Sequence, residues 1–184
     1  MRDRLVEHAE DVFRRKGFHA ASVQDLTRAA GVPKGSFYNH FAHKQDLAVE
    51  VVHRYVGATD VSDLDGDGPV LERLRRHLNR QNERIAATGV EFGCLLGTFA
   101  DDGTAAGERV REAVREALAV RTGALAAAIE AGQAAGEVTG RRPAAALAAF
   151  LIDVLEGATL RAKARGDQSS LAEEIDIALD ALRT

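Results

Sequence analysis

Polar side chains gather between residues 34 and 44 in a pattern suited to hydrogen bonding with DNA. The segment from Pro33 to Lys44 reads PKGSFYNHFAHK. Ammonium and hydroxyl groups can bind phosphate oxygens, and an Asn amide can pair with both hydrogen-bonding atoms at the major-groove edge of adenine. Phe37 and Phe41 are four residues apart, so we expect them on one buried face of a short helix. The remaining side chains would then form a polar surface that faces outward.

The residues before this segment predict the helix and turn that position it. Ser22, followed three residues later by Asp25, is a helix start signal in which hydroxyl and carboxylate bind free backbone amides. Gly31 can adopt the left-handed conformation that ends a helix, and Pro33 suits the first turn of the next one. Two helices joined by a turn that contains glycine, the second presenting donors, form a helix-turn-helix.

These residues resemble a known family. The segment from Leu5 to Val52 resembles the DNA-binding domain of the tetracycline-repressor (TetR) family of bacterial transcription regulators. The matching pieces are FRRKGFHAAS, VQDLTRAAGV and PKGSFYNHFAHKQDL. One departure is His43, where the family often has Ser or Asn as the helix cap.

The residue chemistry and the resemblance together give a set of predicted DNA contacts. Lys34, Ser36, Asn39 and His40 are candidates for contact with base edges, whereas the resemblance implies that Tyr38 and Lys44 bind phosphates. Ser22 and Gln24 could offer side chains and backbone amides to phosphate, although Ser22 could also serve only as a helix cap. The predicted contacts are Ser22, Gln24, Lys34, Gly35, Ser36, Tyr38, Asn39, His40 and Lys44.

Charge is distributed unevenly along the 184 residues. The chain has a formal net charge of −4, but residues 1–55 contain nine Lys or Arg against seven Asp or Glu, and five of the six His. The excess of positive charge thus lies at the end that carries the helix-turn-helix. Arg14 to Lys16 form either a solvated helix end or a further phosphate contact.

The rest of the chain predicts an all-α fold. Runs of alternating β-branched residues are missing, and no stretch of about 18 apolar residues could span a membrane. An N-terminal helix-turn-helix domain of three helices, residues 1–46, would precede a helical bundle domain for ligand binding and dimerisation, residues 47–184. The roughly nine expected helices span residues 3–16, 22–30, 33–40, 43–58, 70–87, 94–100, 107–135, 143–165 and 169–183.

The last two expected helices carry apolar stripes at helical spacing. Paired with their symmetry mates, these stripes would form a four-helix bundle in a homodimer that reads a palindromic operator. Alternatively, they close the core of a single chain. The predicted interface residues are Leu147, Leu151, Val154, Leu155, Ala158, Leu171, Ile175, Ala178, Leu179 and Leu182.

The resemblance also implies that a small-molecule effector binds among the central helices and releases the DNA. Apolar walls with a few polar groups are what such a pocket needs. The candidate lining residues are Tyr55, His77, Gln81, Phe92, Cys94, Phe99, Phe150 and Asp153.

Cys94 is the only cysteine, and a second hypothesis for it is that its thiol acts as a sensor. The segment GCLLG at 93–97 resembles family members that sense electrophiles or oxidants, and a helix start near Cys94 would favour the thiolate. The opposing reading is a buried, inert side chain. One cysteine allows no internal disulfide and fits a reducing cytoplasm.

Other function classes lack their motifs in this chain. We find no catalytic triad spacing, no metal cluster such as E-x-x-H and no phosphate loop, so we expect no enzyme activity, no cofactor and no metal. The D-x-D-G segment at 63–66 lacks the spacing of a calcium loop. A helical-bundle enzyme, a transcription activator and a nucleoid protein remain as alternatives to a repressor.

Overall fold

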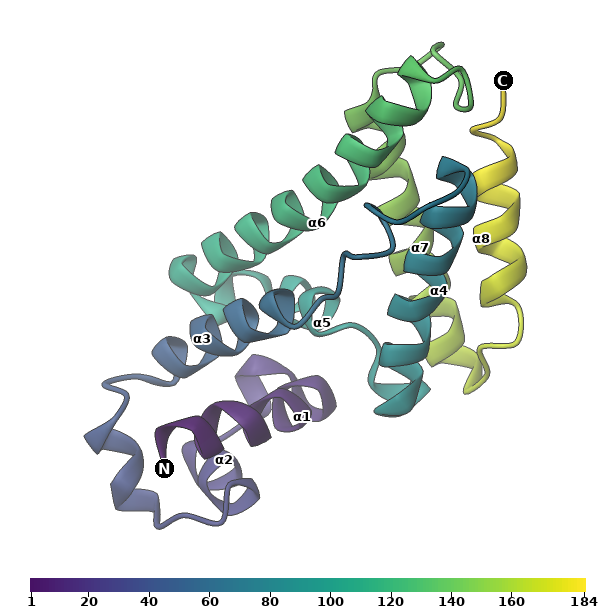
Figure 1. The fold of residues 1–184 in the computed structure, drawn as a ribbon. Helices are drawn as coiled ribbons and strands as arrows, with labels where there is room; N and C mark the ends of the chain where they lie inside the picture. The colour runs from purple at the N-terminus through teal and green to yellow at the C-terminus, as the bar shows by residue number, and fades with distance from the viewer. The chain divides into compact units, whose positions relative to one another are not determined.

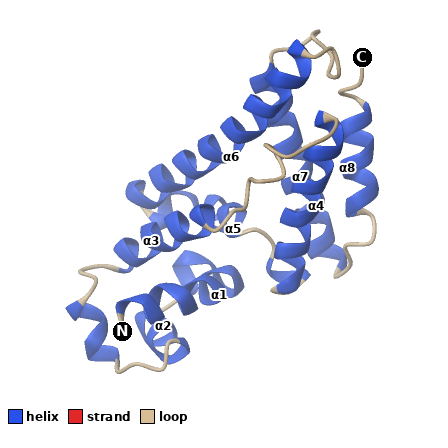
Figure 2. Cartoon of the chain, in the orientation of Figure 1, coloured by secondary structure: helices blue, strands red, loops and turns tan.

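The computed structural model describes residues 1–184 and contains only helices and loops (Figure 2). One isolated β-bridge joins Val138 and Arg183. The predicted all-α class is confirmed. Eight α-helices and the 3-10 helix η1 correspond to the nine expected helices, and two further 3-10 turns join them (Figure 1). The elements are α1 (Arg2–Ala20), α2 (Val23–Ala29), η1 (Lys34–Asn39), α3 (Lys44–Gly57), α4 (Val70–Ala87), η2 (Val90–Phe92), α5 (Leu95–Asp101), η3 (Gly103–Ala106), α6 (Glu108–Ala134), α7 (Ala144–Arg165) and α8 (Leu171–Asp180).

The chain divides into two compact units, each made of two segments. The first unit is Met1–Ala58 with Cys94–Leu118, and the second is Thr59–Gly93 with Ala119–Thr184. The boundary between functional domains after residue 46 stays a prediction, since compact packing does not by itself assign function.

The first unit has an aromatic core around α1. Helix α1 contacts α2, α3 and α5, and the rings of Phe13, Phe18 and Phe99 meet there. The Phe13 and Phe99 centroids are 5.2 Å apart in an edge-to-face arrangement, a favoured geometry for aromatic pairs. Phe99 is almost fully buried, so α5 is held against α1 by this cluster.

Helix α1 continues beyond its predicted end at residue 16, but with a break. Gly17 has φ +73° and ψ 174°, so two helical segments meet there and the second ends at Ala20. Only glycine adopts this backbone conformation without strain. The Arg14 side chain is buried, so the interpretation as a solvated helix end is wrong for this residue. Lys16 is exposed and pairs with Asp25 at 2.8 Å, and a phosphate contact by this segment stays a prediction.

The second unit is built on α4, α7 and α8, which lie side by side in Figure 1. Leu74, Leu78, Leu125 and Ile129 are among its fully buried side chains. The apolar stripes predicted on α7 and α8 face this core of the single chain. Nine of the ten predicted interface residues are at most 8% exposed, and Val154 is half-buried.

No helix of the chain combines the length and apolar character needed to cross a membrane.

Candidate nucleic-acid interface

Helix α2 begins with the predicted capping box. The Ser22 hydroxyl oxygen accepts a hydrogen bond from the Asp25 amide at 3.1 Å, and the Asp25 carboxylate accepts one from the Ser22 amide at 3.0 Å. Hydrogen bonds from Lys16 and then from Ser22 hold the pKa of Asp25 well below its ordinary value. The capping role of Ser22 is confirmed. Its phosphate contact stays a prediction, for which the exposed side chain remains available.

The turn after α2 has the geometry that Gly31 predicted. Gly31 has φ +63°, and the Val32 amide donates to the Thr27 carbonyl at 2.9 Å, which closes the helix end. A side chain at position 31 would also meet the Arg4 guanidinium, because a Cβ there would lie 2.9 Å from it.

The second helix of the motif is a 3-10 helix rather than an α-helix. It runs over Lys34–Asn39, and Pro33 lies just before it as the N-cap residue instead of in its first turn. Phe37 and Phe41 are buried, with ring centroids 5.7 Å apart, as predicted from their spacing. Phe37 lies within η1 and Phe41 two residues after its end, so the two buried rings anchor the segment at both places.

The predicted DNA contacts on this segment are mostly exposed. Lys34, Gly35, Asn39 and His40 are exposed, and Tyr38 is 60% exposed. Ser36 is half-buried, and its hydroxyl donates to the Pro33 carbonyl at 2.6 Å, so that only its lone pairs remain available to a ligand. Gln24 on α2 is exposed too. Their contact with DNA stays a prediction.

Lys44 has partners inside the protein. Its ammonium donates to the carbonyls of Phe18 at 2.6 Å and Ala21 at 2.7 Å, and lies 4.3 Å from the centroid of the Phe18 ring. Burial lowers the pKa of Lys44, while the nearby Asp102 carboxylate opposes this effect. The resemblance implied that Lys44 binds phosphate; in this structure the ammonium joins the end of α1 to the start of α3.

The candidate effector residues belong to both units and are described here unit by unit. In the first, the Tyr55 hydroxyl oxygen lies 3.6 Å from Cys94 Sγ, and Phe99 belongs to the aromatic core. In the second, His77 and Gln81 are buried on α4, and Phe92 is half-buried in η2. Phe150, 42% exposed, and Asp153 lie on the outer face of α7, away from the interior of the second unit.

His77 is the most unusual polar residue of the second unit. It is 6% exposed, its Nδ1 has no hydrogen-bond partner, and burial lowers its pKa despite the nearby Asp63 carboxylate. A buried imidazole with an unpaired nitrogen is a polar group of the kind that small-molecule sites use. A ligand contact by His77 stays a prediction.

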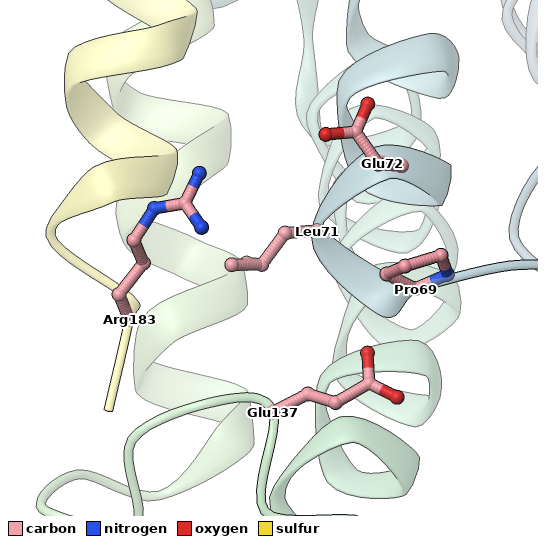
Figure 3. Close-up of a pocket in the computed structure, with 5 residues that line it drawn as sticks. All are labelled: Pro69, Leu71, Glu72, Glu137 and Arg183. Atoms are coloured by element: carbon pink, nitrogen blue, oxygen red, sulfur yellow. The ribbon is translucent and has the colours of Figure 1, made fainter.

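The second unit also contains an open cavity of about 350 Å³ at the start of α4. It is lined by Pro69, Leu71, Glu72, Glu137 and Arg183, whose side chains Figure 3 shows around the first turn of α4 and the C-terminal segment. The Glu137 carboxylate accepts a hydrogen bond from the Val70 amide at 2.6 Å, so it caps α4. None of the predicted effector residues lines this cavity.

One residue with a clear role was not among the predicted site residues. The Asp102 carboxylate accepts hydrogen bonds from the amides of Phe18 at 2.6 Å and His19 at 3.2 Å. The signal in the sequence is Gly17, because a break there frees these amides and requires an acceptor. The sequence does not indicate which acceptor, since Asp102 lies more than eighty residues further along the chain.

Two protein-family models match most of the chain. The family model "Bacterial regulatory proteins, tetR family" matches residues 5–51, and "Tetracyclin repressor-like, C-terminal domain" matches residues 70–177. The transcriptional repressor DhaR of Mycobacterium sp. strain GP1 is 31% identical over 99% of this chain and 92% of its own length.

Two solved structures share the fold at full length. The crystal structure of the regulatory protein TetR from Rhodobacter sphaeroides has a TM-score of 0.89 and 28% identity, over 98% of this chain and 97% of that one. A cysteine mutant of the TetR-family regulator CifR, complexed with 26-bp double-strand operator DNA, has a TM-score of 0.84 and 29% identity, over 98% of this chain and 96% of CifR. The chain therefore belongs to the TetR family of bacterial transcription regulators.

Proposed function

We propose that this protein is a dimeric, sequence-specific DNA-binding repressor that a small-molecule effector releases from a palindromic operator. The observation that supports this most is the row of exposed donors on η1, mounted on the buried rings of Phe37 and Phe41. Its relative DhaR is called a transcriptional repressor, and the similar regulator CifR was solved on operator DNA. Such a protein acts on the chromosome, so its proposed location is the cytoplasm.

Each exposed group has a proposed task at the DNA. Helix η1 enters the major groove, where Asn39 contacts an adenine edge and Lys34 a base or phosphate nearby. The Tyr38 hydroxyl binds phosphate, and α2 crosses the backbone with Ser22 and Gln24 toward it. Phosphate contacts set the register of η1 on the duplex, and base contacts select the sequence.

The proposed dimer interface lies on the outer faces of α7 and α8. The stripe residues predicted from the sequence are used inside the single chain, and different apolar side chains are exposed on the same two helices. Leu160 is 63% exposed, Ile177 is 64% exposed and Phe150 is 42% exposed. Burying this surface against a second copy removes apolar area from water, which is the main driving force of association.

Selection of binding sites from random DNA tests the proposal directly. The protein should enrich a palindrome, and fluorescence polarisation should then give tight binding that weakens as salt rises, because each neutralised phosphate releases counterions. Enrichment of no sequence, or equal affinity for every duplex, would contradict a sequence-specific regulator and favour a nucleoid role or an enzyme.

Asn39→Ala is expected to relax the sequence preference rather than to abolish binding. Losing one bidentate contact costs about 1–3 kcal/mol at the base pair it reads. Affinity for the selected site should therefore fall about 5- to 150-fold, and the dependence of affinity on salt should stay the same. Gln24→Ala, the control at a proposed phosphate contact, should weaken binding to all sequences alike; an unchanged consensus with Asn39→Ala would remove Asn39 from the base-reading set.

A thiol-based response is the second candidate, favoured by the contact between Cys94 Sγ and the Tyr55 hydroxyl at the start of α5. Modification of this sulfur would separate the two side chains and disturb the packing of α5. A mild electrophile should then release DNA from the wild type, and a thiol should restore binding if the adduct is reversible. Cys94 is the only cysteine, so Cys94→Ser should abolish the response; an equal response in this variant would leave non-covalent effectors as the explanation.

A further inference from the structure

The junction between α1 and α2 depends on one carboxylate from a distant part of the first unit. Gly17 breaks α1, so the amides of Phe18 and His19 have no carbonyl one turn earlier to bind. Asp102 supplies both acceptors, with its two oxygens 2.6 Å and 3.2 Å from the Phe18 and His19 nitrogens. Hydrogen bonds from backbone amides to a carboxylate are charge-assisted and stronger than neutral ones.

The fit around this carboxylate is close. A Cβ at position 17 would lie 3.0 Å from one Asp102 oxygen and 3.4 Å from the other. Glycine at 17 is therefore required twice, by its positive φ and by the approach of Asp102. The missing side chain of Gly17 thus leaves the space that the Asp102 carboxylate occupies next to the junction between α1 and α2.

The carbonyls of the same junction are also held. Lys44 donates to the carbonyls of Phe18 and Ala21, so the segment 18–21 is bound from both sides: its amides by Asp102 and its carbonyls by Lys44. Ser22, the next residue, is the N-cap of α2. The hydrogen bonds that hold residues 18–21 therefore also determine the direction of the α2 axis relative to α1.

Asp102 lies at the end of a helix that is packed tightly into the first unit. It is the C-cap residue of α5, and its amide donates to the Thr98 carbonyl at 3.3 Å. Leu95, Leu96 and Phe99 of α5 are almost fully buried. Because α5 is a short helix with a packed apolar face, its C-terminal residue follows the helix as a rigid extension.

We propose that Asp102 is a positioning residue for DNA binding: its carboxylate fixes the junction between α1 and α2 and thereby orients α2 and η1 for the operator. The inference rests on the proposed function, since it assigns Asp102 to the same DNA interface. Asp102 acts from the protein side and touches no DNA.

The sign of the effect separates positioning from simple electrostatics. Removing a negative charge from a DNA-binding unit should strengthen attraction to phosphate if charge alone matters. Removing a positioning group should weaken binding, because only the fraction of molecules in the competent arrangement binds. Asp101 provides a matched control: it is the preceding carboxylate, exposed, with the same formal charge.

The test compares wild type, Asp102→Ala, Asp102→Asn and Asp101→Ala in full-length protein, using the operator selected by the wild type. We expect Asp102→Ala to speed hydrogen exchange at the Phe18 and His19 amides about tenfold or more, as charged hydrogen bonds of this kind are worth 10-fold or more in an equilibrium. Operator affinity should fall by a similar factor, with an unchanged salt slope. Asp102→Asn keeps the shape of the side chain but only one acceptor oxygen, so its exchange rates and operator affinity should lie between those of the wild type and Asp102→Ala. Asp101→Ala should bind the operator as tightly as the wild type or slightly more tightly.

Two results would overturn the inference. One is unchanged exchange at Phe18 and His19 in both Asp102 variants; the other is faster exchange with equal or tighter operator binding. If Asp102→Ala does not fold, as judged by circular dichroism, the isosteric Asp102→Asn carries the test. Selection of no operator by the wild type would instead defeat the proposed function, and the exchange measurement, which needs no DNA, would still decide whether Asp102 holds the junction.

Discussion

Replacing Phe37 by Ala is expected to destabilise the helix-turn-helix more than any other single change in this segment. Phe37 is fully buried, and its ring centroid lies 5.7 Å from that of Phe41 and 5.3 Å from that of Tyr38. Truncating a buried Phe costs about 3–5 kcal/mol in lost transfer energy and in the cavity left behind. Thermal unfolding followed by circular dichroism should show a midpoint lower by about 10 °C for a chain of this size.

Tyr38→Ala is the control for this change, because it removes a ring of similar size from the neighbouring position. Tyr38 is 60% exposed, so its loss should cost only the edge-to-face contact with Phe37, about 1 kcal/mol. Operator binding should weaken in this variant while the fold persists. Equal losses of stability in the two variants would contradict the assignment of Phe37 as the anchor of η1.

Placing a charge on the outer faces of α7 and α8 is expected to remove operator binding almost entirely. Leu160→Glu with Ile177→Glu would bring four carboxylates into the proposed interface of a symmetric dimer. Burying charges without partners is strongly unfavourable, so the protein should become monomeric. A monomer reads one half-site, and loss of the linked second half-site should lower affinity about 10²- to 10⁴-fold.

Analytical ultracentrifugation and fluorescence polarisation together check this expectation, with Val120→Glu as the control. Val120, on α6, is 61% exposed and apolar like Leu160, but lies outside α7 and α8. The Val120→Glu variant should have the same dimer mass and the same affinity for the operator as the wild type. A double variant that remains dimeric and still binds the palindrome would move the interface to another surface.

Local signals predicted the elements of this fold well. The capping pair Ser22 and Asp25, the left-handed Gly31 and the paired Phe37 and Phe41 act between residues at most five positions apart. Interactions of this range can be recognised in a sequence because spacing alone brings the groups together. The 3-10 form of η1 was not predicted, since helices with i+3 and i+4 contacts share most residue preferences.

Interactions between distant segments could not be predicted in the same way. The stripes on α7 and α8 were correctly identified as apolar, but their periodicity is the same whether the face meets its own chain or a partner. Phe150 and Asp153 were grouped with the effector residues for their chemistry, and they lie on an exposed face. The partners of Lys44 and the role of Asp102 depend on contacts between segments more than twenty residues apart.

The division of the first unit into two segments bears on the construction of chimeric sensors. Residues 1–58 pack with residues 94–118, so the DNA-reading end is not one continuous piece of sequence. A chimeric protein that joins residues 1–58 of this chain to the remainder of a second TetR-family protein would contain Gly17 but not Asp102. The second protein would then have to supply the acceptor for the Phe18 and His19 amides. Functional hybrids should be recovered more often when both segments are transplanted together, or when the recipient already has an acidic residue at the position of Asp102.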